Sequence, residues 1–127
     1  MADKRLSEWH EAVLKRDPTL LGNILADDVE FHSPFFWIPK KSKEQTFFIL
    51  MAVSEIFENF YYHREWIEGD DMALEFEAHI GDVIVKGIDL IHFNTHGKID
   101  HFEVMIRPMK ALAMLGEMMS KKFEAFK

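Results

Sequence analysis

The sequence predicts an α+β domain in which helices pack on one face of an antiparallel sheet. The first observation is a change of hydrophobic period, because apolar residues recur at helical spacing up to about residue 57 and at every second residue after it. The second observation is that only short breaks of turn composition separate the period-two segments, so consecutive strands must pair antiparallel. A chain of 127 residues with 48% hydrophobic residues is expected to fold as a single domain, 1–127.

Two helices are expected at the start of the chain. The apolar residues of 4–16 share one helical face, which predicts an amphipathic helix; they are Leu6, Trp9, Val13 and Leu14. Asp17 before Pro18 is typical of a helix N-cap followed by the first helical position. The buried stripe of this second helix is expected to comprise Leu20, Leu21, Ile24 and Leu25.

A short strand and a third helix follow. Alternation of apolar and polar residues predicts a strand over 29–33, which Pro34 ends. Ser42 and Gln45 have the spacing of a capping box, which predicts a helix over 42–57.

The second half of the chain predicts a four-stranded meander and a closing helix. The expected strands cover 59–68, 72–80, 83–93 and 98–107, and the helix covers 109–125. Strands of nine or more residues twist strongly and can curl around the helices. A curled sheet closed by helices leaves a blind apolar cavity, which is the usual shape of a small-molecule site.

Composition excludes several classes of function. Acidic residues outnumber basic residues 22 to 15, and the net charge of −7 argues against nucleic acid or an anionic membrane as a partner. The absence of Cys excludes disulfides, thiol nucleophiles and thiolate metal sites. The longest apolar run, 47–53, is too short to span a bilayer, and residues 1–10 hold no apolar signal core, so a cytoplasmic location is expected.

Four segments carry a resemblance to a known superfamily by their order and spacing: Trp9 eight residues before Asp17, 25–34 (LADDVEFHSP), 87–93 (GIDLIHF) and 97–108. Over nearly its whole length the chain resembles the nuclear-transport-factor-2-like superfamily, most of all the branch of ketosteroid isomerases and SnoaL-like polyketide cyclases. The resemblance implies a cone-shaped, curved antiparallel (mixed) sheet wrapped around three N-terminal helices, with a C-terminal helix, known as the cystatin-like α+β roll. This scaffold hosts isomerases, dehydratases, hydrolases, cyclases and binding modules alike.

The resemblance to the isomerases implies three polar pocket positions: a Tyr donor on the first helix, an Asp general base before a Pro, and a protonated Asp in the long strand. The matching positions here hold Trp9, Ser33 and Asp89. Trp9 retains an N–H donor, whereas Ser33 cannot abstract a proton without a base beside it. Of the three positions, only Asp89 therefore keeps the residue type and chemistry that the resemblance implies. The position of the general base holds no residue that can act as a base alone.

Asp89 is the leading catalytic candidate. Alternation places it on one face with apolar residues, namely Val85, Gly87, Ile91 and Phe93. Such surroundings raise the pKa of a carboxyl group and let it act as an acid, a base or a donor to a ligand carbonyl. The alternative is a buried structural acid that is hydrogen-bonded to a helix or to Trp9.

His32 is the second catalytic candidate. A neutral imidazole is the natural base near pH 7, and a bend before Pro34 would bring His32 to the pocket rim. The alternative is an ordinary surface or capping histidine, because adjacent strand residues such as His32 and Ser33 point to opposite faces.

Aromatic and apolar side chains are expected to line a pocket for a small apolar ligand. The expected ligand-binding residues are Trp9, Ser33, Phe35, Trp37, Phe48, Phe93 and Val104. Core packing explains such aromatic residues equally well, and both roles hold in a cone whose core forms the pocket wall.

No metal and no cofactor is expected, because the sequence places no three metal ligands on one face, even though His92, His96 and His101 fall around one turn. A homodimer is expected through the outer face of the last strands, where an apolar row recurs: Ile84, Ile88, Leu90 and Met105.

Two functions remain open. In the first, the domain binds an apolar carbonyl compound and acts as an isomerase, cyclase or dehydratase by general acid–base chemistry. Asp89 would then polarise or protonate an oxygen, His32 would move the proton and Trp9 would orient the ligand. In the second, the chain is a non-catalytic ligand-binding or dimeric accessory module, in which Asp89 anchors the ligand.

Overall fold

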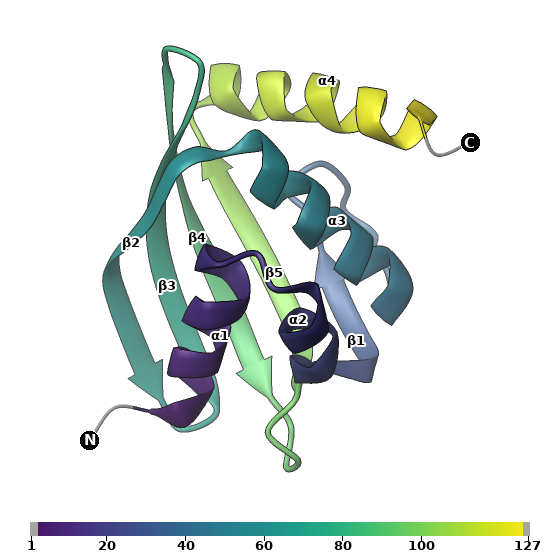
Figure 1. The fold of residues 1–127 in the computed structure, drawn as a ribbon, viewed down its shortest axis with the longest axis vertical. Helices are drawn as coiled ribbons and strands as arrows, with labels where there is room; N and C mark the ends of the chain where they lie inside the picture. Colours follow the sequence, from purple (N-terminus) through teal and green to yellow (C-terminus); the bar gives the residue numbers. More distant parts are fainter. Residues whose placement is uncertain (1–2, 126–127) are drawn as a thin grey trace.

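A computed structural model describes residues 3–125 and confirms the α+β cone: helices cover one side of a curved five-stranded sheet (Figure 1). The elements in chain order are α1 (Lys4–Leu14), α2 (Pro18–Ile24), β1 (Leu25–His32), α3 (Lys43–Ile56), β2 (Glu58–Glu68), β3 (Asp71–Ile80), β4 (Val83–Phe93), β5 (Ile99–Arg107) and α4 (Met109–Ala125). No helix among residues 3–125 is long and apolar enough to cross a membrane.

The sheet is mixed. Its strand order is β1-β5-β4-β3-β2, and the four later strands pair antiparallel as a meander. Strand β1 lies parallel to β5 at the edge of the sheet. Parallel pairing requires a crossover connection, and the chain between β1 and β5 provides it through α3 and the first three strands of the meander.

The predicted elements agree with the structure except near β1. Leu25, expected at the end of the second helix, begins the strand instead and pairs with Ile99. The register shifts between Leu25 and Glu30, and both Leu25 and Ala26 are buried. This irregularity hides the period-two pattern in the first half of the strand, which is why alternation is visible only from Val29 onward.

Two hairpins set the register of the meander. Each has a two-residue loop, between Glu68 and Asp71 and between Ile80 and Val83. The first loop residue has a positive φ in both, 61° at Gly69 and 58° at Gly81. Glycine adopts this backbone conformation without steric cost, so the chain reverses tightly at both positions.

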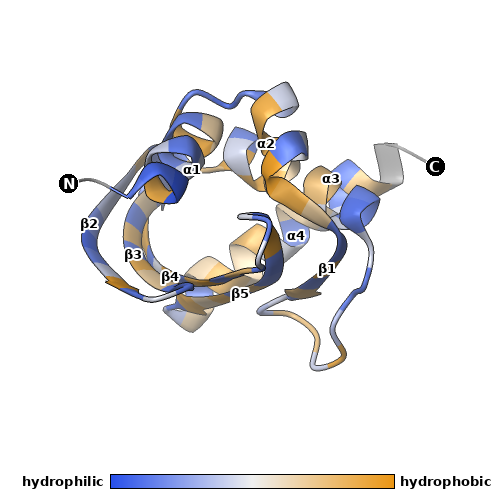
Figure 2. Cartoon of the chain, turned by 90° about the horizontal axis from the view of Figure 1, so that it is seen from below, coloured by the Kyte–Doolittle hydropathy of each residue, from blue (hydrophilic) through white to orange (hydrophobic). Residues whose placement is uncertain are grey.

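The core fills the concave side of the sheet. One buried cluster lies under α1 and α2 and includes Trp9, Leu21 and Phe102, and a second lies under α4 and includes Val85 and Leu115. Figure 2 shows the sheet curving around this side, with α1, α2 and α3 opposite it. The strands alternate between hydrophobic and hydrophilic residues, as expected for a sheet with one buried face.

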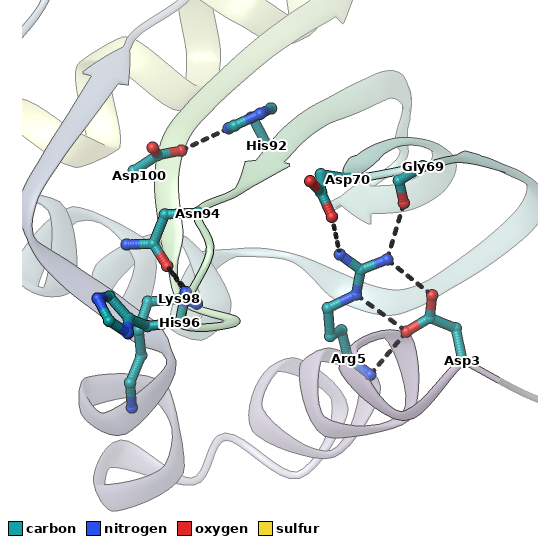
Figure 3. A network of polar contacts seen from close by, with 9 residues as sticks. All are labelled: Asp3, Arg5, Gly69, Asp70, His92, Asn94, His96, Lys98 and Asp100. Atoms are coloured by element: carbon teal, nitrogen blue, oxygen red, sulfur yellow. Dashed lines mark hydrogen bonds and ion pairs between the residues drawn. The ribbon is translucent and has the colours of Figure 1, made fainter.

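Arg5 fastens the start of α1 to the tip of the β2–β3 hairpin (Figure 3). Its guanidinium donates to Asp3 at 2.9 Å, to Asp70 at 2.9 Å and to the Gly69 carbonyl at 2.8 Å. The same group lies 4.9 Å from the centre of the Phe93 ring. These contacts fix α1 against the sheet one turn before Trp9, and they thereby position that side chain.

Candidate functional site

A cavity of about 300 Å³ lies between the concave face of the sheet and the helices. Its walls are mostly apolar and come from α1, α3, α4, the inner face of the sheet and the segment after β1; they include Trp9, Phe31, Leu50, Phe76, Phe102 and Leu115. Two exposed cations, Arg16 and Lys40, also line it. The curled sheet therefore leaves the apolar cavity that the long strands predict.

Asp89 on β4 contributes a carboxyl group to this cavity. The residue is only 5% exposed, and its alternation neighbours Val85 and Ile91 are buried beside it, as predicted. Burial raises the pKa of Asp89 from 3.8 to about 7, and the hydrogen bond from Tyr62 opposes that rise. The structure thus buries this carboxyl group as predicted, and titration of Asp89 well above its ordinary range stays a prediction.

A hydrogen-bonded chain of three side chains ends at Asp89. The Trp9 indole Nε1–H donates to the Tyr62 hydroxyl at 2.9 Å, and that hydroxyl donates to Asp89 Oδ2 at 2.6 Å. Burial and the neighbouring Asp89 charge raise the pKa of the Tyr62 phenol well above 10, so it stays a donor at neutral pH. The polar groups inside the apolar cavity are thus pre-organised around one carboxyl group.

Sequence reasoning missed Tyr62. The register of β2 shifts on both sides of this residue, and Asn59, three residues earlier, has a φ of 54°. Because of these irregularities, strand alternation did not show whether Tyr61 or Tyr62 faces inward. The structure places Tyr61 on the outer face, where it donates to Glu77. The signal available in the sequence was the aromatic Phe60 two residues earlier, because residues two apart in a strand share a face. Phe60 lines the same cavity.

Three more of the predicted ligand-binding residues line the cavity: Ser33, Phe35 and Val104. The Ser33 hydroxyl accepts the backbone N–H of Phe35 at 3.0 Å, so it caps a turn. The Phe35 ring packs on Gly116 of α4, where an added Cβ would lie 3.1 Å from the ring. This contact holds the segment after β1 against α4 at the cavity wall.

His32 does not reach the cavity, which corrects its predicted place at the pocket rim. The pairing of β1 with β5 continues without a shift from Glu30 through Phe31 to His32. Without a bulge, Phe31 takes the inward position and His32 points to the opposite face, where it contacts Glu30 at 3.0 Å. The structure therefore brings no imidazole of β1 to Asp89.

Three predicted ligand-binding residues also lie outside the cavity lining, and each has its own reason. Trp37 is 95% exposed, because it sits where the segment between β1 and α3 leaves the body of the domain. Phe48 on α3 turns toward Phe123 of α4, with ring centres 5.3 Å apart. Phe93 is buried in the core at the far end of β4, beneath Arg5.

The cavity offers one group that changes charge near neutral pH. Among the described lining residues Asp89 is the sole carboxyl group, and none is a histidine. A pKa of about 7 populates both forms of this carboxyl group at neutral pH. The arrangement can therefore accept a proton from a bound molecule and return it, while the Tyr62 hydroxyl donates a hydrogen bond beside it.

The expectation that no three metal-binding side chains share one face is wrong. Glu30, His32 and His101 lie on the same outer face of the sheet, and one ligand atom from each lies within 4.8 Å of the others. His92 bonds instead to Asp100, at 2.7 Å, which leaves it out of this group. The sequence could not place these residues together because the contact depends on the parallel pairing of β1 with β5.

No family model and no curated protein matches this sequence. Solved structures do. A steroid delta-isomerase from Pseudomonas aeruginosa is 39% identical, with a TM-score of 0.91 over 96% of this chain and 90% of that chain. A protein with a cystatin-like fold from Silicibacter pomeroyi is 34% identical, with a TM-score of 0.89 over 94% and 84%. An NTF2-like protein from Burkholderia xenovorans, 16% identical with a TM-score of 0.68 over 81% and 80%, shares the fold.

Proposed function

Because the chain belongs to the nuclear-transport-factor-2-like superfamily, we propose that its cone binds a compact, largely apolar carbonyl compound and shifts a proton on it through Asp89. The observation that carries this proposal is the buried Asp89 carboxyl group, which accepts the Tyr62 hydrogen bond inside an apolar cavity. A buried carboxyl group with a pKa near 7 is suited to proton transfer at physiological pH.

The cavity defines the class of ligand. Its volume of about 300 Å³ lies at the small end of the range for ligand pockets. Apolar walls favour a hydrocarbon body. The Tyr62 hydroxyl, which donates to Asp89 in the free protein, can turn its O–H to a ligand oxygen when Asp89 is protonated. A compact ketone with a carbon–carbon double bond near its carbonyl group meets both requirements.

The proposed step is an isomerisation. Ionised Asp89 takes a proton from the carbon next to the carbonyl group, and the electron pair of that C–H bond moves through the carbonyl carbon onto the oxygen. Once Asp89 carries the proton, the Tyr62 O–H turns from Asp89 Oδ2 to the enolate oxygen, while the Trp9 indole N–H still donates to the Tyr62 oxygen. The acid form of Asp89 then returns the proton to a different carbon, so one C–H bond breaks, one forms and the double bond migrates.

Two observations support a mechanism that uses one carboxyl group. Ser33 occupies the position that the resemblance gives to a second carboxylate, and its hydroxyl serves a turn. His32, the other candidate base, lies outside the cavity. The similarity to a solved structure described as a steroid delta-isomerase supports the class of reaction.

The test is conversion of a small β,γ-unsaturated cyclic ketone, followed by the ultraviolet absorbance of the conjugated product. Asp89→Asn removes the proton-transfer group and is expected to lower kcat/KM about 100-fold or more. Tyr61→Phe is the matched control, since Tyr61 lies on the outer face and should leave the rate unchanged. Equal rates in the wild type and Asp89→Asn would contradict the proposal.

The second candidate function is ligand carriage without chemistry. The composition of the cavity wall favours it, because the described lining residues include no second carboxyl group and no imidazole that could transfer a proton together with Asp89. Trp9 provides the readout, since it lines the cavity, and replacement of Trp37 and Trp66 by Phe leaves it as the sole tryptophan. Saturable fluorescence changes with the same ketone, without turnover, would support carriage.

We also propose that a second copy of the chain covers the outer face of the sheet. The helices pack on the concave side, and the outer face keeps large apolar side chains half exposed, 53% at Ile84 and 49% at Met105. Leu90 lies on the same face of β4, beyond the Ile88–Met105 pair, and is partly buried. Apolar patches of this kind are rarely left in water by a monomer.

A further inference from the structure

Four side chains with metal-binding atoms lie together on the outer face of the sheet, where β1 meets β5. Glu30 and His32 are two residues apart on β1, so both point to this face. The parallel register places His101 beside Glu30 and Glu103 beside His32. The four residues thus form a compact group from two neighbouring strands.

The distances within the group are short. Glu30 Oε1 lies 3.0 Å from His32 Nε2, and His101 Nε2 lies 3.7 Å from Glu103 Oε1. The two imidazole rings have centres 4.4 Å apart and planes tilted by 32°. One ligand atom each from Glu30, His32 and His101 falls within 4.8 Å of the other two.

We propose that Glu30, His32 and His101 form a binding site for a divalent transition-metal ion such as zinc. Two imidazoles and one carboxylate are a donor set that zinc uses, and tetrahedral coordination requires ligand atoms about 3.4 Å apart. The ligand atoms of the three partly exposed side chains now lie within 4.8 Å of one another, and small side-chain rotations would bring them to the spacing that tetrahedral coordination requires. The nitrogen donors disfavour Ca²⁺ and Mg²⁺, which select oxygen ligands.

The site is distinct from the cavity. Phe31 and Phe102, the neighbours of these ligands along the two strands, are buried on the inner face, and both line the cavity. The metal ion would therefore sit on the opposite side of the sheet from Asp89. It would cross-link the edge strand β1 to β5, with Glu103 or water in the remaining coordination position.

The first experiment is calorimetric titration of zinc chloride into untagged, chelator-treated protein in its native oligomeric state. The wild type is expected to bind one zinc ion per chain. His101→Gln is expected to lower the affinity about tenfold or more. His96→Gln is the matched control, because it makes the same chemical change on an exposed turn outside the group. Retained affinity in His96→Gln supports the site.

A second readout keeps the test independent of any one variant. Zinc is expected to raise the Tm of the wild type and of His96→Gln, to raise it clearly less in Glu30→Gln and His101→Gln, and to act reversibly with EDTA. Circular dichroism checks folding, and Glu30→Gln replaces His101→Gln if the latter does not fold. Failure of the wild type to bind zinc, or equal affinity in His101→Gln and His96→Gln, would overturn the proposal.

Discussion

The Tyr62 hydroxyl on β2 lies 2.6 Å from Asp89 Oδ2 on β4, although β3 separates the two strands in the sheet. On β3, Phe76 pairs with Tyr62 of β2 on one side and with Gly87 of β4 on the other. Gly87 has no side chain, so the Phe76 ring occupies that space. The curvature of the sheet and this missing side chain allow Tyr62 to reach Asp89 across the concave face.

Removing the Tyr62 hydroxyl should destabilise the protein. Tyr62→Phe leaves the Trp9 indole N–H and the Asp89 carboxyl group without their shared partner. The expected loss in the free energy of unfolding is about 2–3 kcal/mol at a pH where Asp89 is ionised. Urea unfolding at about pH 8 measures it. The neighbouring Tyr61→Phe, on the outer face, should change it by less than about 0.5 kcal/mol; equal effects of the two variants would contradict the buried chain.

Asp89 should give stability a pH dependence of definite sign. Its pKa is about 7 in the folded protein against 3.8 ordinarily. Between these two pKa values the folded state holds a proton that the unfolded state has released. The free energy of unfolding therefore falls as pH rises from about 4 to about 7, and it becomes constant above about pH 7. The shift corresponds to at most about 4 kcal/mol.

Asp89→Asn isolates this contribution. The asparagine variant lacks the titrating group, so its stability relative to the wild type should increase between about pH 5 and about pH 8. Urea unfolding of both proteins at the two pH values measures the difference. A difference that stays constant with pH would show that Asp89 does not titrate between them.

Gly87→Ala should be strongly destabilising. A Cβ at this position would lie 2.7 Å from Phe76 Cε2 and 2.8 Å from the Met105 carbonyl oxygen, and backbone atoms cannot easily give way. We expect a loss of about 2–3 kcal/mol from this overpacking. Gly22→Ala in α2 is the matched control, since nothing lies within 4 Å of its Cβ position, and it should stabilise by up to about 1 kcal/mol. Equal Tm values for the two variants would contradict the packing described for Phe76.

A charge on the outer face should dissociate the proposed dimer. Leu90→Glu places a carboxylate at one end of the apolar row, beside Glu103, where association would bury it without a cationic partner. Light scattering at micromolar concentration is expected to give a dimer for the wild type and a monomer for the variant. Met109→Glu, exposed on α4, should stay dimeric. A monomeric wild type would contradict the proposed dimer.

The sequence predicted the fold and Asp89 because the relevant signals are local and regular. Strand β4 keeps a continuous register with β3 from Val83 to His92, so alternation placed Asp89 on the buried face. The hairpin turns were visible as short breaks, and the ends of β4 matched the prediction.

The residues that sequence reasoning misplaced depend on irregular or long-range geometry. Tyr62 lies three residues after Asn59, which has a positive φ, and between two register shifts that no local sequence pattern indicates. His32 depends on whether β1 bulges before Pro34, and the structure has no bulge there. The group of Glu30, His32 and His101 arises from the pairing of strands that are far apart in sequence.

Titration of the Asp89 carboxyl carbon by ¹³C nuclear magnetic resonance tests the central claim most directly. The resonance is assigned by its loss in Asp89→Asn. Because burial outweighs the hydrogen bond from Tyr62, the carboxyl group should titrate at about 7 in the wild type. Titration near the ordinary value of 3.8 would mean that water solvates the carboxyl group, and it would contradict a desolvated proton-transfer group in the cavity.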